Sequence, residues 1–139
     1  MRSVALAPVF LLLLACSPDS PETRIRKAFD ASVAAVEAGD AVAAAACLDE
    51  GFRGPEGMTQ AEARAYLLGV LRQEKVGITV VAQQLEVRGA QATQVVDLLL
   101  TGRSGGSLLP QDSSRRTLQL RWALAGKAWK IRELRTATP

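Results

Sequence analysis

Few side chains of this 139-residue chain could do acid–base chemistry. The chain has no histidine, which removes the commonest general base near neutral pH and most zinc sites. The main candidates are the single tyrosine, Tyr66, and a carboxylate in an apolar stretch, Asp97 in QVVDLLL; Glu133 and Gln83 are weaker. Buried together, a carboxylate and a phenol supply a general base and a hydrogen-bond donor. The favoured alternative is structural: Tyr66 packs a helix with its hydroxyl at the edge, and Asp97 faces solvent or pairs with an arginine.

The two cysteines suggest a different chemistry, because Cys16 directly follows an apolar segment. Arg2, the apolar residues 4–14 and the small Ala15 have the order of a secretory signal. Eleven residues are too few to cross about 30 Å of hydrocarbon as a permanent helix. We therefore expect residues 1–15 to be a signal peptide that is removed. An ordinary cleavage near Ala15 would leave a free or disulfide-bonded thiol.

The favoured outcome is lipidation of Cys16. The run LLAC, which ends at Cys16, resembles the bacterial lipobox, in which the signal is removed before a lipid-modified cysteine. Each buried methylene contributes about 0.8 kcal/mol, so the two or three acyl chains that the resemblance implies anchor a protein firmly. An acylated sulfur cannot form a disulfide with Cys47, which we expect to be a small buried hydrophobe in AVAAAACLDE. A Cys16–Cys47 disulfide is the minority alternative.

The segment after Cys16 is predicted to be a tether. Residues 17–22, SPDSPE, are polar and contain two prolines, which is typical of a short extended linker. We assign residues 16–21 to the lipidated cysteine and tether, and residues 22–136 to one folded domain. In lipoproteins of Gram-negative bacteria, a serine after the cysteine, here Ser17, favours sorting to the outer membrane. The expected location is the periplasmic face of the bacterial envelope, with the outer membrane favoured over the inner.

The first part of the domain has helical periodicity. In residues 22–38 the apolar side chains recur on one helical face, with charged side chains off it. Gly39 suits the end of this helix, and Asp40 suits the N-cap of a second helix, residues 41–48. Two helical patterns joined this closely predict a compact helix–turn–helix.

A third helix is predicted after a glycine-rich loop. Residues 51–58, GFRGPEGM, contain three glycines and a proline, so we expect no regular structure there. Thr59 and Glu62 then form the capping-box pattern T-x-x-E. The helix that this pattern begins is expected to end near residue 74.

The remainder of the chain alternates as strands do. Residues 76–87, VGITVVAQQLEV, are rich in β-branched side chains, and their alternation slips near residues 82–84, which predicts a β-bulge. A tight turn at residues 88–90 leads into QATQVVDLLLT, and a loop over residues 102–114 leads into RRTLQLRWAL. The final strand is WKIREL.

The last hairpin has a register that can be worked out from a two-residue turn at Gly126-Lys127. The expected pairs are Ala125 with Ala128, Leu124 with Trp129, and Trp122 with Ile131. The four large apolar side chains then share one face. The other face is expected to carry Ala123, Lys130, Arg121 and Arg132. Register and amphipathicity therefore agree.

Three helices followed by about four strands is an α+β order. The segments AFDASVAAVEAGD, GFRGPEGMT and GKAWKIREL resemble, in this order, the nuclear-transport-factor-2-like (SnoaL-like) superfamily over about residues 21–134. More narrowly, the chain is similar to small bacterial lipoproteins with one such domain. The resemblance implies a cystatin-like cone, in which a curved antiparallel sheet of about four strands wraps around the first helix. The side chains expected to line its cavity are Tyr66, Asp97, Trp122, Trp129 and Ile131.

Two further features have both functional and structural interpretations. The run GRSGGS lies between strands rather than before a helix, so it predicts a loop and not a phosphate site. The apolar Leu108, Leu109 and Pro110 that follow could close over the cavity mouth, touch a partner, or pack on the sheet edge.

Charge is unevenly distributed along the chain. Residues 16–114 contain nine basic and thirteen acidic side chains, whereas residues 115–139 contain seven basic and one acidic. A basic hairpin could rest on anionic lipid, but a solvated outer face is the favoured interpretation. Nucleic acid is not an expected partner of an exported protein.

These features lead to an expected function. We expect a lipid-anchored, non-catalytic periplasmic module, without a cofactor or metal, that binds a small apolar ligand in the cone or an envelope protein partner. A pocket of about 300 Å³ or more would support the ligand. Some relatives in the superfamily, such as ketosteroid isomerase and scytalone dehydratase, are enzymes, so an isomerase or dehydratase using Asp97 and Tyr66 is one alternative. A homodimer formed sheet to sheet is another.

Overall fold

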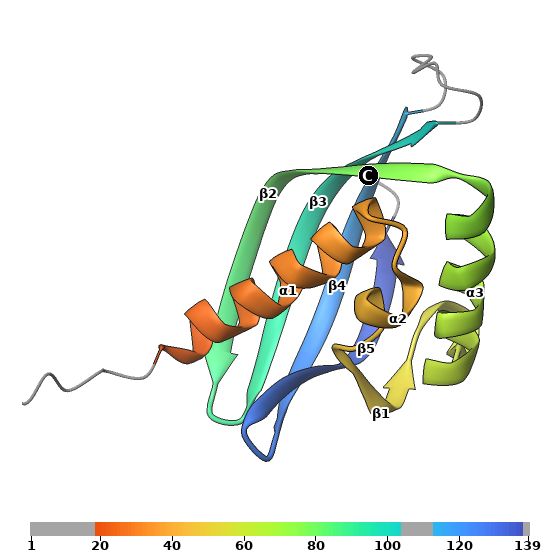
Figure 1. Cartoon of the computed structure of the whole chain (residues 1–139). Helices are drawn as coiled ribbons and strands as arrows, with labels where there is room; N and C mark the ends of the chain where they lie inside the picture. The colour runs from red at the N-terminus through yellow and green to blue at the C-terminus, as the bar shows by residue number, and fades with distance from the viewer. Residues whose placement is uncertain (1–18, 104–112, 138–139) are drawn as a thin grey trace, which may run out of the picture.

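The computed structural model describes residues 19–103 and 113–137. Figure 1 shows α1 lying across one face of a sheet, with α2 beside the C-terminal half of α1 and α3 farther out. The predictions for Cys16 and for the apolar residues 108–110 fall outside the described residues. The elements, in chain order, are α1 (Pro21–Glu37), α2 (Ala41–Ala44), β1 (Leu48–Arg53), the 3-10 helix η1 (Pro55–Gly57), α3 (Gln60–Gln73), β2 (Lys75–Arg88), β3 (Gln91–Arg103), β4 (Ser113–Ala125) and β5 (Ala128–Ala137).

The predicted helix boundaries are confirmed where they depend on caps. Gly39 adopts φ +77°, the left-handed conformation that ends α1. The side chain of Asp40 accepts a hydrogen bond from the Ala43 N–H at 3.0 Å. Thr59 Oγ1 accepts one from the Glu62 N–H at 3.3 Å and so begins α3. Helix α2, however, ends at Ala44 rather than at residue 48.

A fifth strand, β1, replaces the end of the predicted second helix and the start of the predicted loop. It pairs in parallel with β5, so the sheet is mixed and has the order β1-β5-β4-β3-β2. The backbone N–H of Ile131 donates to the Cys47 carbonyl at 2.7 Å, which attaches the two chain segments. Leu48 and Phe52 are buried, because this edge position lets both side chains reach the core. The expectation of about four antiparallel strands was therefore wrong in number and in direction.

The predicted bulge in β2 is confirmed and lies slightly earlier than expected. The register of β2 against β3 shifts between Val80 and Ala82, which leaves Val81 as the extra residue, 54% exposed. Without this extra residue, Ile78 and Leu85 could not both point to the inner face of the sheet.

The β4–β5 hairpin has the predicted register near its turn. The pairs Ala125–Ala128, Leu124–Trp129 and Trp122–Ile131 are all present. A second bulge then shifts the register, so that Arg121 lies opposite Glu133 and not Arg132. The shift keeps Leu134, opposite Leu120, on the inner face.

The core fills the space between the helices and the inner face of the sheet. Ile25 and Phe29 of α1 enter it from above the sheet, and Phe52 of β1 enters it from the edge. The other buried members of the core are Ala45, Leu48, Ala63, Ala92, Val96, Leu98, Leu120, Trp122, Trp129 and Ile131.

Among the described residues, no helix is both long and apolar enough to cross a bilayer.

Candidate functional site

The structure does not bring Asp97 and Tyr66 together. The neighbours of Asp97 in β3, Val96 and Leu98, are buried in the core, so its own side chain lies on the opposite, convex face of the sheet. There its carboxylate accepts a hydrogen bond from Thr117 Oγ1 at 2.6 Å and lies 3.7 Å from the Arg115 guanidinium. Tyr66 is 62% exposed on α3. Neither residue lines a cavity in the cone, which corrects the expectation for both.

Trp122 and Ile131 are packed core residues, and Trp122 takes part in a buried polar chain. Trp122 Nε1 donates to Gln94 Oε1 at 3.0 Å, and Gln94 Nε2 donates to Gln83 Oε1 at 3.1 Å. Gln94 has no exposed surface, so both contacts are needed to satisfy its amide. Gln94 was not predicted as a site residue, although its alternation with Ala92 and Val96 indicated an inward-pointing side chain.

An open groove lies between α1, α2 and the start of β5, and we call it the flank groove. Its volume is about 430 Å³. The groove exists because the facing side chains of α1 and α2 are alanines, which are too small to fill the space between the two helices. The lining residues are Arg24, Lys27, Ala28, Ala31, Ser32, Ala43, Ala46, Cys47, Ala128, Trp129 and Lys130. Of the five predicted cavity residues, the flank groove contains Trp129.

Trp129 differs from Trp122 in its hydrogen bonding. Its side chain is only 5% exposed, and its buried Nε1 has no hydrogen-bond partner in the described part of the chain. Such an unsatisfied donor costs about 1–3 kcal/mol. Buried donors of this kind are rare in folded proteins and require an explanation.

Cys47 forms part of the groove wall as a free, half-buried thiol. Burial raises its pKa, and this effect outweighs the opposing influence of Ser32 and of the Lys130 ammonium. The thiol is therefore protonated at neutral pH, which makes it a poor nucleophile. Its expected role as a small hydrophobe agrees with this position.

The rim of the flank groove is cationic. Arg24 donates to the Lys127 carbonyl in the β4–β5 turn, and Lys130 Nζ donates to the Ala46 carbonyl at 2.7 Å. Lys27 forms an ion pair with Asp19 at 2.6 Å. Among the described residues that line the groove, none is acidic. An apolar floor with a cationic rim suits an amphipathic molecule.

A second hollow, of about 410 Å³, lies where the C-terminal ends of α1 and α3 meet the start of β2. Its lining includes two acidic side chains, Glu37 and Glu74, and two basic side chains, Arg72 and Lys75. These charges balance, and the remaining lining includes exposed helix ends. It therefore offers less chemical selectivity than the flank groove.

The comparisons with known proteins show the fold. No protein-family profile and no curated protein matches the chain. An NTF2-like protein from Cytophaga hutchinsonii superposes with a TM-score of 0.71 at 13% identity, over 87% of this chain and 100% of that chain. A variant of Rv3472, a protein of unknown function from Mycobacterium tuberculosis, gives a TM-score of 0.71 at 17% identity, over 85% of this chain and 71% of that chain.

An enzyme also has this architecture. A hexachlorocyclohexane dehydrochlorinase, LinA Type2, superposes with a TM-score of 0.67 at 13% identity, over 84% of this chain and 83% of that chain. Likeness at these identities concerns the fold and not the activity. The chain therefore has the nuclear-transport-factor-2-like cone fold, which it shares with at least one enzyme and with a protein of unknown function.

Proposed function

We propose that the protein is a lipid-anchored, non-catalytic binding module on the periplasmic face of a bacterial envelope, most favourably at the outer membrane. In this proposal the flank groove holds a small amphipathic molecule. The observation that carries the proposal is the groove itself, whose volume of about 430 Å³ falls within the range of small-molecule sites.

The groove floor supports an apolar ligand portion. Ala28 and Ala31 of α1 lie on one side, Ala43 of α2 and the following Ala46 lie on another, and the largely buried Trp129 adds a small apolar surface. Alanine side chains have no conformational freedom to lose when a ligand covers them. Ligand burial against this surface is therefore favoured by the hydrophobic effect at little entropic cost to the protein.

The charged groups support binding rather than catalysis. Asp97 is paired with Thr117 and Arg115 on the convex face of the sheet, whereas the groove lies on the side covered by the helices. The thiol of Cys47, which does lie in the groove, is kept protonated by burial. The described groove residues therefore offer positive charge and apolar surface but no general base.

Lipidation of Cys16 supplies the location in this proposal, and mass spectrometry tests it. The native chain should begin at Cys16 and exceed the mass of its polypeptide by the mass of its acyl groups. The Cys16→Ser variant should lack this increment. A wild-type mass that differs from the variant's only by the substitution itself would contradict the anchor.

The groove can be tested by filling it. Ala31 and Ala34 are both exposed alanines on α1, but only Ala31 lines the groove. With the neutral apolar fluorophore N-phenyl-1-naphthylamine as the probe, Ala31→Phe should lower affinity about tenfold, a loss of about 1.4 kcal/mol, because the ring occupies the site. Ala34→Phe should leave affinity unchanged. Equal affinities for both variants would contradict binding in the groove.

A sheet-to-sheet homodimer is the second candidate. Val95 is partly exposed on the convex face, as an apolar contact in such a dimer requires. The same face also carries Arg115, Arg121 and Arg135, which form ion pairs with Asp97 and Glu133, and burial of these charged side chains in a dimer would cost desolvation energy. Sedimentation at micromolar concentration separates monomer from dimer.

A further inference from the structure

We propose that the flank groove takes the anionic head group of a phospholipid from the membrane to which the chain is anchored. This inference rests on the proposed function and names the ligand class of the same groove. It follows from three observations: the charge left uncompensated at the groove, the hydrogen-bond donor left without an acceptor, and the point at which the chain enters the domain.

The arginines of the convex face are compensated. Arg115 lies 3.7 Å from Asp97, Arg132 lies 3.7 Å from Asp49, and Arg121 lies 3.8 Å from Glu133. Although the C-terminal part of the chain is strongly basic, these pairs neutralise much of its charge. The basic composition alone therefore does not make the convex face a site for anions.

The cations of the flank groove are not compensated in the same way. Among the described residues, Arg24 and Lys130 have no carboxylate partner, and both are half-buried with their donors on backbone carbonyls. Lys27 is the exception, because it pairs with Asp19 at 2.6 Å and is compensated like the arginines of the convex face. Partly buried cations beside an apolar surface favour a bound anion, because charge-assisted hydrogen bonds gain strength away from water.

The indole of Trp129 supplies a donor for the same ligand. Its buried Nε1 lacks an acceptor within the described residues, whereas a phospholipid head group carries several phosphate and ester oxygens. Because Nε1 is covered in the unliganded fold, a phosphate oxygen reaches this N–H when the groove wall shifts on binding, and the new contact then removes the cost of the unsatisfied donor. Apolar acyl carbons of the lipid then lie over the alanines of the floor.

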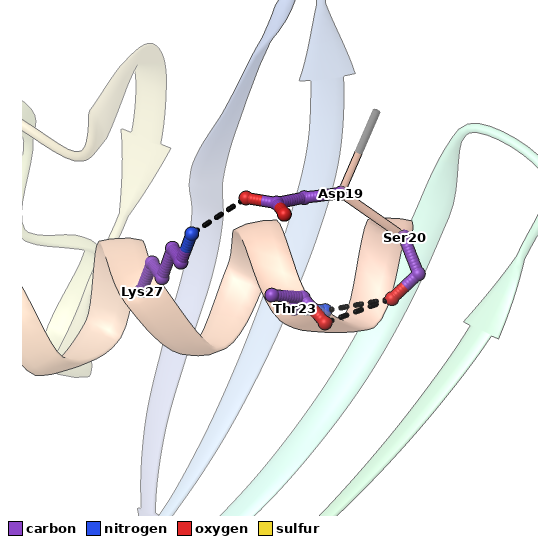
Figure 2. A network of polar contacts seen from close by, with 4 residues as sticks. All are labelled: Asp19, Ser20, Thr23 and Lys27. Carbon is purple, nitrogen blue, oxygen red and sulfur yellow. Dashed lines mark hydrogen bonds and ion pairs between the residues drawn. The ribbon is translucent and has the colours of Figure 1, made fainter. Parts of the chain in front are cut away.

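The start of the domain places the membrane near the groove. Figure 2 shows Ser20 capping α1 through Thr23 and Asp19 turned back toward Lys27, a groove residue. The chain therefore enters α1 on the groove side. Three peptide steps separate Asp19 from Cys16, a distance of at most about 11 Å when extended. A lipid attached at Cys16 would hold the groove close to the bilayer surface.

Vesicle binding of the unlipidated chain tests this inference separately from the anchor. The chain from residue 16 onward keeps every described element, and Cys16→Ser removes the site of lipidation. We expect it to bind vesicles of phosphatidylcholine containing phosphatidylglycerol, and not vesicles of phosphatidylcholine alone. Arg24→Gln with Lys130→Gln should lower the partition coefficient about thirtyfold, because each cation near an anionic surface contributes about 1 kcal/mol.

A matched control separates the groove from diffuse attraction. Arg121→Gln with Arg132→Gln removes the same charge from compensated positions on the convex face, so binding should change less than about twofold. Ala31→Phe keeps every charge but fills the groove, so it should also weaken binding, and it provides a second test if the charge variant fails to fold. Inorganic phosphate should not compete.

Each contrary outcome overturns the inference in a different way. Equal binding to neutral and anionic vesicles overturns the choice of head group, while probe binding sensitive to Ala31→Phe would keep the proposed function. Equal losses in the charge variant and its control, or full binding by Ala31→Phe, would assign the attraction to the surface in general. Competition by inorganic phosphate would assign the site to a soluble anion, and no vesicle binding at all would exclude a lipid.

Discussion

The two tryptophans allow an internal comparison of a satisfied and an unsatisfied buried donor. Both lie in the β4–β5 hairpin, and both are almost completely buried. Trp122 Nε1 donates to Gln94 at 3.0 Å, whereas Trp129 Nε1 has no acceptor in the described part of the chain. Replacement by phenylalanine removes the same atoms at both positions and leaves a small cavity, at a cost of about 1–2 kcal/mol in each case.

The polar terms then have opposite signs. Trp122→Phe leaves buried Gln94 Oε1 without its donor, which adds about 1–3 kcal/mol to the loss. Trp129→Phe removes a donor that was unsatisfied, which returns about 1–3 kcal/mol. The expected loss is therefore about 2–5 kcal/mol for Trp122→Phe and near zero for Trp129→Phe, a gap of at least about 2 kcal/mol.

Urea unfolding in the absence of amphiphile measures this gap, provided the m-value stays constant. The double variant Trp122→Phe with Gln94→Leu is the control. It replaces both partners of the hydrogen bond by apolar groups and should recover part of the stability lost by Trp122→Phe. Equal losses for the two single variants, within about 0.5 kcal/mol, would refute the contrast between the two indoles.

Three smaller predictions concern local features. Because burial raises the pKa of Cys47, native-state alkylation at pH 8 should be slower than in the denatured chain. The same shift stabilises the folded state at neutral pH, and this contribution should be lost as the pH rises through the folded-state pKa. Thr59→Ala should cost about 1 kcal/mol in urea unfolding, because the Glu62 N–H loses its cap. Gly77→Ala should cost about 1–3 kcal/mol, since the new Cβ would lie 2.5 Å from Thr101 Oγ1, and Thr101→Ala should relieve this loss.

Local signals in the sequence predicted much of the fold. The caps at Asp40 and Thr59 depend on side chains that bond to the backbone three residues away, so they can be recognised without tertiary structure. The β4–β5 register follows from a two-residue turn, which fixes every pair up to the next bulge. Strand β1 was missed because it is short and is stabilised by parallel pairing with β5, distant in sequence.

The candidate site was harder to predict for a physical reason. In QVVDLLL the residues on both sides of the strand are apolar, so alternation could not tell which face Asp97 occupies. The flank groove depends on alanines of two helices that come together only in the folded chain. Trp129 was predicted to line a cavity inside the cone, whereas the structure places it at the flank groove, and its unsatisfied Nε1 depends on the positions of all its neighbours.

The most direct test of an anionic amphiphile in the flank groove is the nuclear magnetic resonance signal of the two indole N–H groups. The chain has two tryptophans, so it gives two such cross-peaks, and Trp129→Phe assigns them. Addition of phosphatidylglycerol in a soluble short-chain form should move the Trp129 cross-peak downfield as its N–H gains an acceptor. The Trp122 cross-peak should stay in place, because its N–H is already bonded to Gln94. An unmoved Trp129 cross-peak at saturating lipid would contradict the account.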